Sequence, residues 1–214
     1  MMKITILTDR KSWIVPYAER LGHELEKLGH DIGLAFEPNE ITEGDCMFIL
    51  GYLRILGPEV LEKNTRNVVI HESDLPKGRG FAPLFWQILE GKSDIIVSLI
   101  EAAKEADAGE IYMQDTLEFK GFELHDELRH EQGEITIKLA LRFIKEWPEA
   151  GRPQQGEPTT YKRRAPKDSE LDFSKPLSKL FQQLRIASNE QYSAFFYHPD
   201  FPGKKFILRI SRED

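Results

Sequence analysis

A histidine stands where a short apolar segment meets a polar loop. Residues 68–70, V-V-I, are followed by His71 and then by E-S-D-L-P-K-G-R-G, 72–80. Apolar runs of this length form buried strands of α/β sheets, and ligands bind outside the carboxyl ends of such strands. We therefore expect the imidazole of His71 to face a crevice.

Asp107, further along the chain, supplies a carboxylate that could orient this imidazole. A carboxylate bound to one ring nitrogen fixes the tautomer and leaves the other nitrogen to accept a proton. Neither a cysteine nor a serine in a nucleophile-elbow setting accompanies His71, so a covalent acyl-enzyme lacks its nucleophile. The pattern favours direct transfer of an acyl group onto an amine, although a histidine at a strand end by itself is more often structural.

Two sequence blocks around these residues resemble the formyltransferase family that uses 10-formyltetrahydrofolate. The first family block reads Asn-x-His-x-Ser-Leu-Leu-Pro and then Arg-Gly, and the second contains Asp-Thr-Gly-Asp-Ile. The second block corresponds here to V-S-L-I-E, 97–101, and D-A-G-E-I, 107–111. Two blocks in the right order and at the right separation are specific, whereas either alone is weak. The residues that match the first block are His71, Ser73, Leu75, Pro76, Arg79 and Gly80.

The chain departs from the family at the Asn that lies two residues before the His and helps to stabilise the oxyanion. Val69 occupies this place, and the nearest asparagine is Asn67. Side chains alternate along a strand, so Asn67 shares a face with His71 but lies about 6 to 7 Å further from it than residue 69. The oxyanion donor is therefore Asn67, a protonated His71 or a backbone N–H of the loop.

The resemblance implies a reaction in which a substrate amine attacks the formyl carbon of 10-formyltetrahydrofolate. His71 would relay the amine proton and Asp107 would hold His71. The expected cofactor-binding residues line a pterin pocket between 53–56 and 101–107, and they are Leu53, Ile55, Leu56, Glu101 and Ala106. The expected substrate-binding residues are the loop serine and four basic residues that suit phosphates, Ser73, Lys77, Arg79, Arg163 and Arg164. The alternative for these five is loop shaping or simple exposure to solvent.

Composition indicates a globular chain of 214 residues with an uneven charge. Residues 1–150 carry 17 basic and 28 acidic groups, giving −11, and residues 151–214 carry 12 and 8, giving +4. A mildly basic end beside an acidic body favours small phosphate groups over a nucleic-acid surface. Because Cys46 is the single cysteine and no apolar run is long enough for a membrane, we expect a cytoplasmic protein without disulfides or membrane contact.

The alternation of apolar runs and helical patterns predicts an α/β fold. We expect a Rossmann-like formyltransferase fold over residues 1–150, with a mostly parallel sheet and helices on both faces. Strands are expected at 3–8, 32–36, 46–50, 94–100 and 111–114, and a long helix at 121–147. After the linker G-R-P-Q-Q-G-E-P, residues 151–214 form a short α+β extension for substrate binding or dimerisation. The lack of Gly-x-Gly-x-x-Gly and of a Walker sequence disfavours a dinucleotide or nucleoside triphosphate cofactor.

The extension resembles the segment that follows the catalytic domain in sugar N-formyltransferases. Y-K-R-R-A-P-K-D-S-E-L-D-F, 161–173, is similar to Arg-x-Pro-x-Asp-Ser-x-Ile-Asp-Trp, and the loop S-D-L-P-K-G-R-G, 73–80, is similar to that of pseudaminic-acid-type formyltransferases. The resemblance implies transfer to the amine of a nucleotide-linked amino-deoxy sugar in surface polysaccharide or nonulosonic acid biosynthesis. The alternatives are glycinamide ribonucleotide or methionyl-tRNA formyltransferase and, outside catalysis, a silent folate- or nucleotide-binding module.

Two further expectations concern the long helix and the end of the chain. His125 and His130 are separated by five positions, which do not share a helix face, so we expect no metal site there. The closing apolar strands need a partner surface, and we therefore expect a homodimer.

Overall fold

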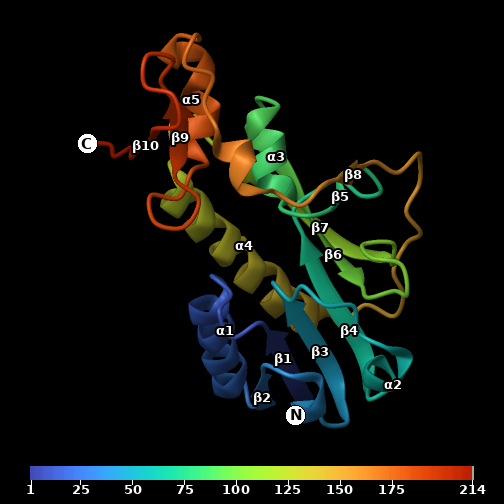
Figure 1. Cartoon of the computed structure of the whole chain (residues 1–214). Helices are drawn as coiled ribbons and strands as arrows, with labels where there is room; N and C mark the ends of the chain where they lie inside the picture. Colours follow the sequence, from blue (N-terminus) through green and yellow to red (C-terminus); the bar gives the residue numbers. More distant parts are fainter. Residues whose placement is uncertain (214) are drawn as a thin grey trace.

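A six-stranded sheet forms the centre of the computed structural model, which describes residues 1–213 (Figure 1). The strand order is β2-β1-β3-β4-β6-β7, and β6 alone runs antiparallel to its neighbours. The predicted mostly parallel sheet is confirmed. The strands are β1 (Lys3–Thr8), β2 (Asp31–Ala35), β3 (Gly44–Leu50), β4 (Asn64–His71), β6 (Asp94–Glu101) and β7 (Ile111–Glu118). β7 continues to Glu118, beyond the expected 111–114. It is an edge strand in which several side chains reach solvent, so polar residues interrupt the apolar pattern that would have indicated its full length.

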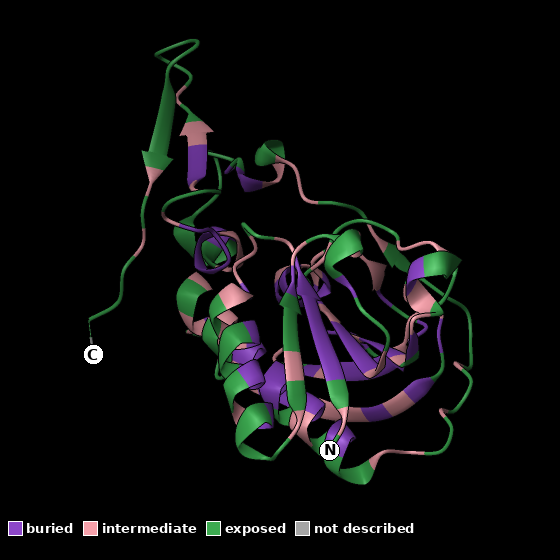
Figure 2. Ribbon diagram, turned by 90° about the horizontal axis from the view of Figure 1, so that it is seen from below, coloured by how far each residue is buried: buried purple, intermediate pink, exposed green. Residues whose placement is uncertain are grey.

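Helices cover both faces of this sheet, as predicted. α1 (Val15–Lys27), α3 (Pro83–Leu89) and α4 (His125–Glu146) share one large core with the strands. The short α2 (Pro58–Leu61), near the 3₁₀ turn η1 (Pro38–Glu40), packs a smaller core on the opposite face. Strands β1 and β3 are buried on both faces, which explains their nearly continuous apolar sequences (Figure 2).

The long helix α4 begins at His125, four positions later than the pattern predicted. The carboxylate of Glu123 accepts the backbone N–H groups of Lys120 and Gly121, at 2.7 and 3.0 Å, and so holds a turn there. Glu127 then caps the helix by accepting the N–H of Leu124 at 2.8 Å. The segment 121–124 is therefore a capping structure rather than the first helical turn.

A glycine lets α4 cross α1 closely. A Cβ at Gly133 would lie 2.3 Å from the ring of Tyr17, which is too close for any side chain. This contact fixes α1 against α4 and hence against the face of the sheet that both helices cover.

The C-terminal extension has its own small core, as the predicted α+β arrangement requires. It contains the 3₁₀ turn η2 (Pro166–Ser169), α5 (Leu177–Arg185) and the hairpin of β9 (Ala194–Tyr197) and β10 (Lys205–Leu208). Arg185 is 1% exposed and donates to the carbonyl and to the carboxylate of Glu123, both at 2.9 Å. The extension is thus docked on the start of α4, while much of the hairpin stays exposed (Figure 2). The expected homodimer stays a prediction.

Residues 151–161 are more than the linker that the sequence indicated. Arg152 exchanges two backbone hydrogen bonds of 2.9 Å with Ile111 at the start of β7. The short strand β8 (Thr160–Tyr161) pairs with β5 (Arg79–Gly80) in the loop that follows β4. We call residues 151–161 the crossing segment, because they run along the body from β7 to this loop (Figure 1).

Candidate active site

The structure brings His71 and Asp107 together at the carboxyl end of β4. The loop 102–110 between β6 and β7 folds back, so that Oδ1 of Asp107 lies 3.6 Å from Nδ1 of His71. The other ring nitrogen, Nε2, lies 2.8 Å from the carbonyl oxygen of Gly78. The ring therefore has a partner at each nitrogen, and His71 is only 6% exposed to solvent.

The partners of the two ring nitrogens decide where a proton can be accepted. A carbonyl oxygen only accepts hydrogen bonds, so Nε2 carries the N–H that Gly78 binds. Nδ1 is then the nitrogen that takes up a further proton, on the side of the Asp107 carboxylate. We expected the carboxylate to bind one nitrogen and leave the other for the substrate. Instead, the backbone fixes the tautomer, and the carboxylate faces the ring nitrogen that carries no hydrogen in this tautomer.

Asp107 is itself held in an unusual conformation. Its φ is +56°, which costs a residue with a side chain about 1 kcal/mol. Its Oδ2 accepts the backbone N–H of Gly80 at 2.8 Å. Two positions later, a Cβ at Gly109 would lie 1.7 Å from the carbonyl oxygen of Glu101, so the loop closes in this way only with glycine. The loop therefore depends on tight backbone contacts.

Asn67 is directed away from His71 toward α2. Its amide donates to the carbonyl of Leu61 at 2.9 Å, and its backbone N–H donates to Glu101. Val69 packs against a small cluster of Leu75, Ile100 and Ile111. Of the three oxyanion donors that the sequence left open, the geometry favours a backbone N–H of the loop, because the Asn67 amide is bound by Leu61 and the Nε2–H of His71 is bound by Gly78.

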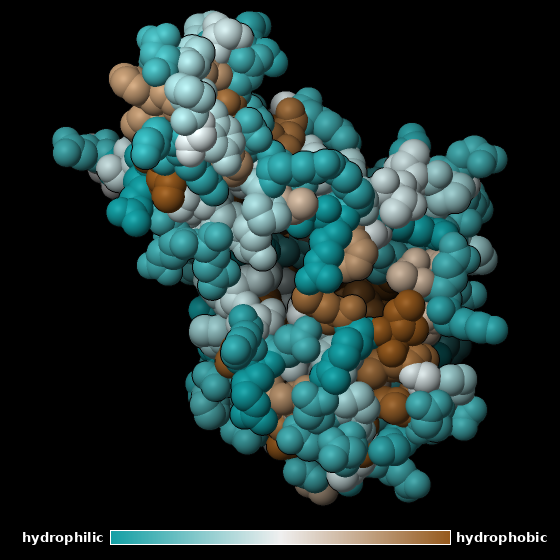
Figure 3. Space-filling view, viewed as in Figure 1, coloured by the Kyte–Doolittle hydropathy of each residue, from teal (hydrophilic) through white to brown (hydrophobic). Residues whose placement is uncertain are grey.

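The segment 53–56 follows β3, which pairs in parallel with β4, and it carries exposed apolar side chains. Leu53 and Ile55 are 56% and 78% exposed, whereas Leu56 is half-buried against the second core. The backbone N–H of Leu53 donates to the carboxylate of Asp9 at 2.9 Å, which ties this loop to the end of β1. Figure 3 shows a hydrophobic area in the hollow near the middle of this face. Exposed apolar side chains suit contact with a flat ring system.

Glu101 and Ala106, which were expected to line the other side of the pterin pocket, lie in different surroundings. Both carboxylate oxygens of Glu101 are engaged, one by the N–H of Asn67 and the other by the hydroxyl of Tyr112 at 2.8 Å. Burial and this bond raise the pKa of the Tyr112 phenol. Ala106 lies exposed in the loop 102–110. Glu101 therefore fixes the strand, and Ala106 is the one of the two that a ligand can reach.

The loop after β4 presents one free basic side chain. Lys77 is exposed, whereas the guanidinium of Arg79 is bound by Gln154 and by Glu105. Ser73 is 1% exposed, its hydroxyl oxygen is buried, and that oxygen has no hydrogen-bond partner within residues 1–213. This placement suits packing of the loop rather than contact with a substrate.

Two neighbouring arginines of the extension lie in different surroundings. Arg163 is exposed, 5.7 Å from the ring centre of Phe81. Arg164 is half-buried, 5.8 Å from the ring centre of Phe85, and donates to Ser169 at 3.5 Å. Burial lowers the pKa of the Arg164 guanidinium. The pair expected to act together is thus divided between two aromatic rings.

The two histidines of α4 also lie apart. Nδ1 of His125 lies 2.8 Å from Asp126 and its ring stacks on Phe85, whereas Nδ1 of His130 lies 3.2 Å from the hydroxyl of Tyr17. Within the described chain, no group of three or more potential metal ligands comes together. None of the helices over residues 1–213 has the length and apolar content that crossing a membrane requires.

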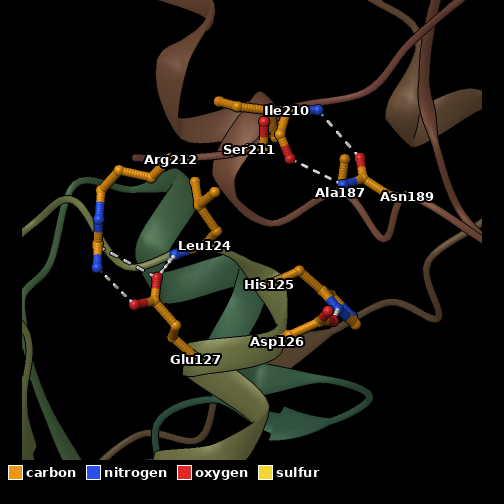
Figure 4. Close-up of a pocket in the computed structure, with 9 residues that line it drawn as sticks. All are labelled: Leu124, His125, Asp126, Glu127, Ala187, Asn189, Ile210, Ser211 and Arg212. Carbon is orange, nitrogen blue, oxygen red and sulfur yellow. Dashed lines mark hydrogen bonds and ion pairs between the residues drawn. The ribbon is translucent and has the colours of Figure 1, made fainter. Parts of the chain in front are cut away.

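A separate cavity of about 330 Å³ lies between the start of α4 and the end of the extension (Figure 4). Arg212 reaches across it to Glu127, at 2.9 Å, and His125 lies at its wall. His71 and Asp107 do not line this cavity.

Two residues that the sequence did not single out bind the loops of the site. Gln154 contacts both the Asp107 loop and Arg79, and Thr159 accepts the N–H of Gly78 through its hydroxyl at 2.8 Å. Both lie in the crossing segment, where Gly and Pro indicated a linker. Their side chains are common in exposed loops, so no local pattern distinguishes them.

The protein thus combines an open α/β sheet with a His–Asp pair at the carboxyl end of a parallel strand. The sequence model of the formyl transferase family matches residues 38–136, which contain both His71 and Asp107. This part of the chain is therefore similar to the formyl transferase family.

A curated relative extends this similarity over most of the chain. The methionyl-tRNA formyltransferase of Sulfurihydrogenibium sp. is 30% identical over 178 residues, which is 75% of this chain. The chain spans 57% of the length of that relative.

Solved structures share the fold at lower identity. A methionyl-tRNA formyltransferase from Clostridium thermocellum has a TM-score of 0.80 and 23% identity, over 97% of each chain. A sugar N-formyltransferase from Shewanella has a TM-score of 0.74 and 15% identity, over all of this chain and 98% of that one. HypX from Aquifex aeolicus, solved in complex with tetrahydrofolic acid, has a TM-score of 0.75 and 21% identity over 91% of this chain and 36% of its own. These likenesses establish the fold.

Proposed function

We propose that the chain transfers a formyl group from 10-formyltetrahydrofolate to the amine of a nucleotide-linked amino-deoxy sugar. The pairing of His71 with Asp107, inside the part of the chain that matches the formyl transferase family, carries this proposal. The pair supplies a base for the amine proton, and no nucleophile for an acyl-enzyme accompanies it.

The reaction begins when the amine nitrogen attacks the formyl carbon and forms a tetrahedral intermediate. Nδ1 of His71 accepts the proton that the nitrogen loses, and the carboxylate of Asp107 stabilises the resulting imidazolium. The intermediate then collapses, the bond between the formyl carbon and the folate nitrogen breaks, and the folate nitrogen takes a proton back. Val69 offers no hydrogen bond to the oxyanion and Gly78 already binds the Nε2–H of His71, which leaves this task to a backbone N–H of the loop.

The folate cosubstrate is supported by the exposed apolar side chains of the segment 53–56. Leu53 and Ile55 are exposed apolar side chains next to a loop whose backbone can offer hydrogen bonds, which is the combination that a pterin needs. HypX from Aquifex aeolicus, which has a similar fold, is described in complex with tetrahydrofolic acid.

A sugar nucleotide as the acceptor is supported by the extension. Residues 151–214 carry the net charge of +4 beside a body of −11, and they contain the segment 161–173 that resembles sugar N-formyltransferases. A sugar N-formyltransferase from Shewanella also matches the fold over the whole chain. Lys77, Arg163 and the half-buried Arg164 are basic groups that suit the phosphates of such an acceptor.

Methionyl-tRNA is the second candidate acceptor, and the 30% identity with a curated methionyl-tRNA formyltransferase favours it. Against it stands the net charge of −7, since binding to a nucleic-acid backbone needs a concentrated basic face.

Incubation of the purified chain with 10-formyltetrahydrofolate and a panel of acceptors tests both candidates. The panel contains nucleotide-linked amino sugars with amines at different ring positions, glycinamide ribonucleotide and methionyl-tRNA. We expect one amino sugar nucleotide to gain the mass of a formyl group. Formylation of methionyl-tRNA alone would replace the first candidate with the second, and the absence of any formylated product would refute both.

A further inference from the structure

The side chain of Gln154 joins the two loops that surround His71. Its Nε2 donates to the carbonyl oxygens of Asp107 and Gly109, at 2.7 and 2.8 Å. Its Oε1 accepts from Nε and Nη2 of Arg79, at 3.3 and 2.8 Å. A carboxamide has two N–H donors and an oxygen that accepts two bonds, so the two loops use the full capacity of this side chain.

Asp107 is thereby held at both of its ends. Gln154 binds its backbone carbonyl, and Gly80, the residue after Arg79, binds its carboxylate. A residue with a side chain keeps a φ of +56° only where contacts with its surroundings stabilise this backbone conformation. Gln154 and Gly80 supply such contacts to the backbone and to the side chain of Asp107.

The crossing segment that carries Gln154 is anchored on each side. Arg152 pairs with Ile111 through two backbone hydrogen bonds. The N–H of Thr159 donates to the carbonyl of Pro76, and its hydroxyl accepts from Gly78, whose carbonyl binds His71. Gln154 therefore acts from a fixed position.

We propose that Gln154 is a positioning residue for formyl transfer, which holds the Asp107 carboxylate where it can share the Nδ1 proton of His71. The inference rests on the proposed function, and Gln154 acts through Asp107 without touching the imidazole. The 3.6 Å between carboxylate and Nδ1 is slightly longer than a hydrogen bond, so a small displacement of the loop removes the interaction.

Gln154→Ala is the first variant, and Gln155→Ala is its matched control. Gln155 has the same side chain, is exposed, and makes no hydrogen bond within residues 1–213. We expect Gln154→Ala to lower kcat by about 10- to 100-fold and to change the KM for folate by less than about threefold. Equal kcat values for the two variants would overturn the proposal.

Gln154→Glu separates the two loops that Gln154 binds. The carboxylate still accepts from Arg79, but it has no N–H for the carbonyls of Asp107 and Gly109. We expect kcat to fall as far as in Gln154→Ala. Full activity of Gln154→Glu would mean that Gln154 acts on Arg79 alone, which contradicts the proposal.

The double variant Gln154→Ala with Asp107→Ala tests whether both residues act as one unit. If Gln154 works through Asp107, its removal costs nothing more once the carboxylate is gone. A further loss of kcat equal to that of Gln154→Ala alone would indicate a general structural role and refute the proposal.

Hydrogen exchange of the Gly80 amide gives a measure that needs no substrate. This N–H donates to Oδ2 of Asp107, so its protection reports where the carboxylate lies. We expect protection to fall at least about fivefold in Gln154→Ala and to stay unchanged in Gln155→Ala. Unchanged protection in Gln154→Ala would refute the inference. A loss of protection in a chain that formylates no acceptor would refute the proposed function while upholding the role of Gln154 in placing Asp107.

Discussion

His71 and His125 each have an aspartate beside them, and the shorter contact belongs to the histidine that is the weaker candidate for catalysis. Nδ1 of His125 lies 2.8 Å from Asp126, whereas Nδ1 of His71 lies 3.6 Å from Asp107. The side chain of Asp126 is 99% exposed, and Asp107 is 15% exposed. His125 also stacks on Phe85, and its surroundings lower its pKa, mainly by burial.

The burial and the fixed position of a His–Asp pair, rather than the distance between its two side chains, make it a candidate for proton transfer. An exposed carboxylate in water holds a partner weakly. Asp107 is fixed by Gly80 and Gln154, and the tautomer of His71 is fixed by Gly78. Catalysis favours groups whose positions are set before the substrate arrives. The region of His125, by contrast, has aromatic rings and Arg164 nearby, which suits binding.

Asp107→Ala and Asp126→Ala make the same change beside the two histidines. We expect Asp107→Ala to lower kcat by about 10² or more, because the imidazolium of His71 loses its partner, with folate affinity nearly intact. His71→Ala should match it. Steady-state kinetics and folate titration measure both effects. Asp126→Ala should keep its kcat. A loss of kcat as large as that of Asp107→Ala would contradict the assignment of proton transfer to His71 rather than His125.

Arg164→Ala tests whether the region of His125 serves binding. We expect the KM for the sugar nucleotide to rise about tenfold, with little change in kcat or in the KM for folate, because a phosphate loses a charged partner. Arg163→Ala, on the exposed side of Phe81, shows whether both arginines are needed. Proportional increases in both KM values would point to a folding defect instead.

Asn67→Ala tests whether Asn67 takes part in catalysis beside His71. Since the amide binds Leu61 near α2, we expect kcat to change by less than about threefold. Loss of this buried bond should lower the free energy of unfolding by about 1 kcal/mol in urea denaturation. A decrease in kcat of about 10² would show that Asn67 supplies the oxyanion donor.

The smallest effect concerns the stability that His125 confers. Burial holds the pKa of His125 in the folded chain below its usual value of 6.5, so the unfolded chain binds the proton first as the pH falls. This contribution to stability is complete above pH 6.5 and is lost as the pH falls toward the folded pKa. In thermal unfolding, His125→Gln should therefore lose less stability than the unaltered chain between neutral and mildly acidic pH. Parallel pH profiles would contradict this assignment.

The sequence predicted the sheet, the large helices and the meeting of His71 with Asp107. These depend on apolar periodicity and on two motifs, both of which are local patterns. The sequence did not predict that Gly78 would fix the tautomer, because the direction of its carbonyl depends on how the loop folds back on His71. It did not predict that Gln154 would hold the Asp107 loop, because these residues are distant in the chain. Arg79 illustrates the same limit, since a basic residue in a loop indicates a phosphate ligand, yet tertiary contacts occupy its guanidinium.

The crossing segment has a consequence for the order in which the hydrogen bonds of the site are completed as the chain is synthesised. His71 and Asp107 leave the ribosome early, together with most of the sheet. Their loops are bonded fully when Gln154 and Thr159 have followed, after the whole of α4. A nascent chain that ends before residue 151 contains all six strands of the sheet but lacks these contacts. The last third of the chain therefore completes the hydrogen bonds around a His–Asp pair that the first two thirds contain.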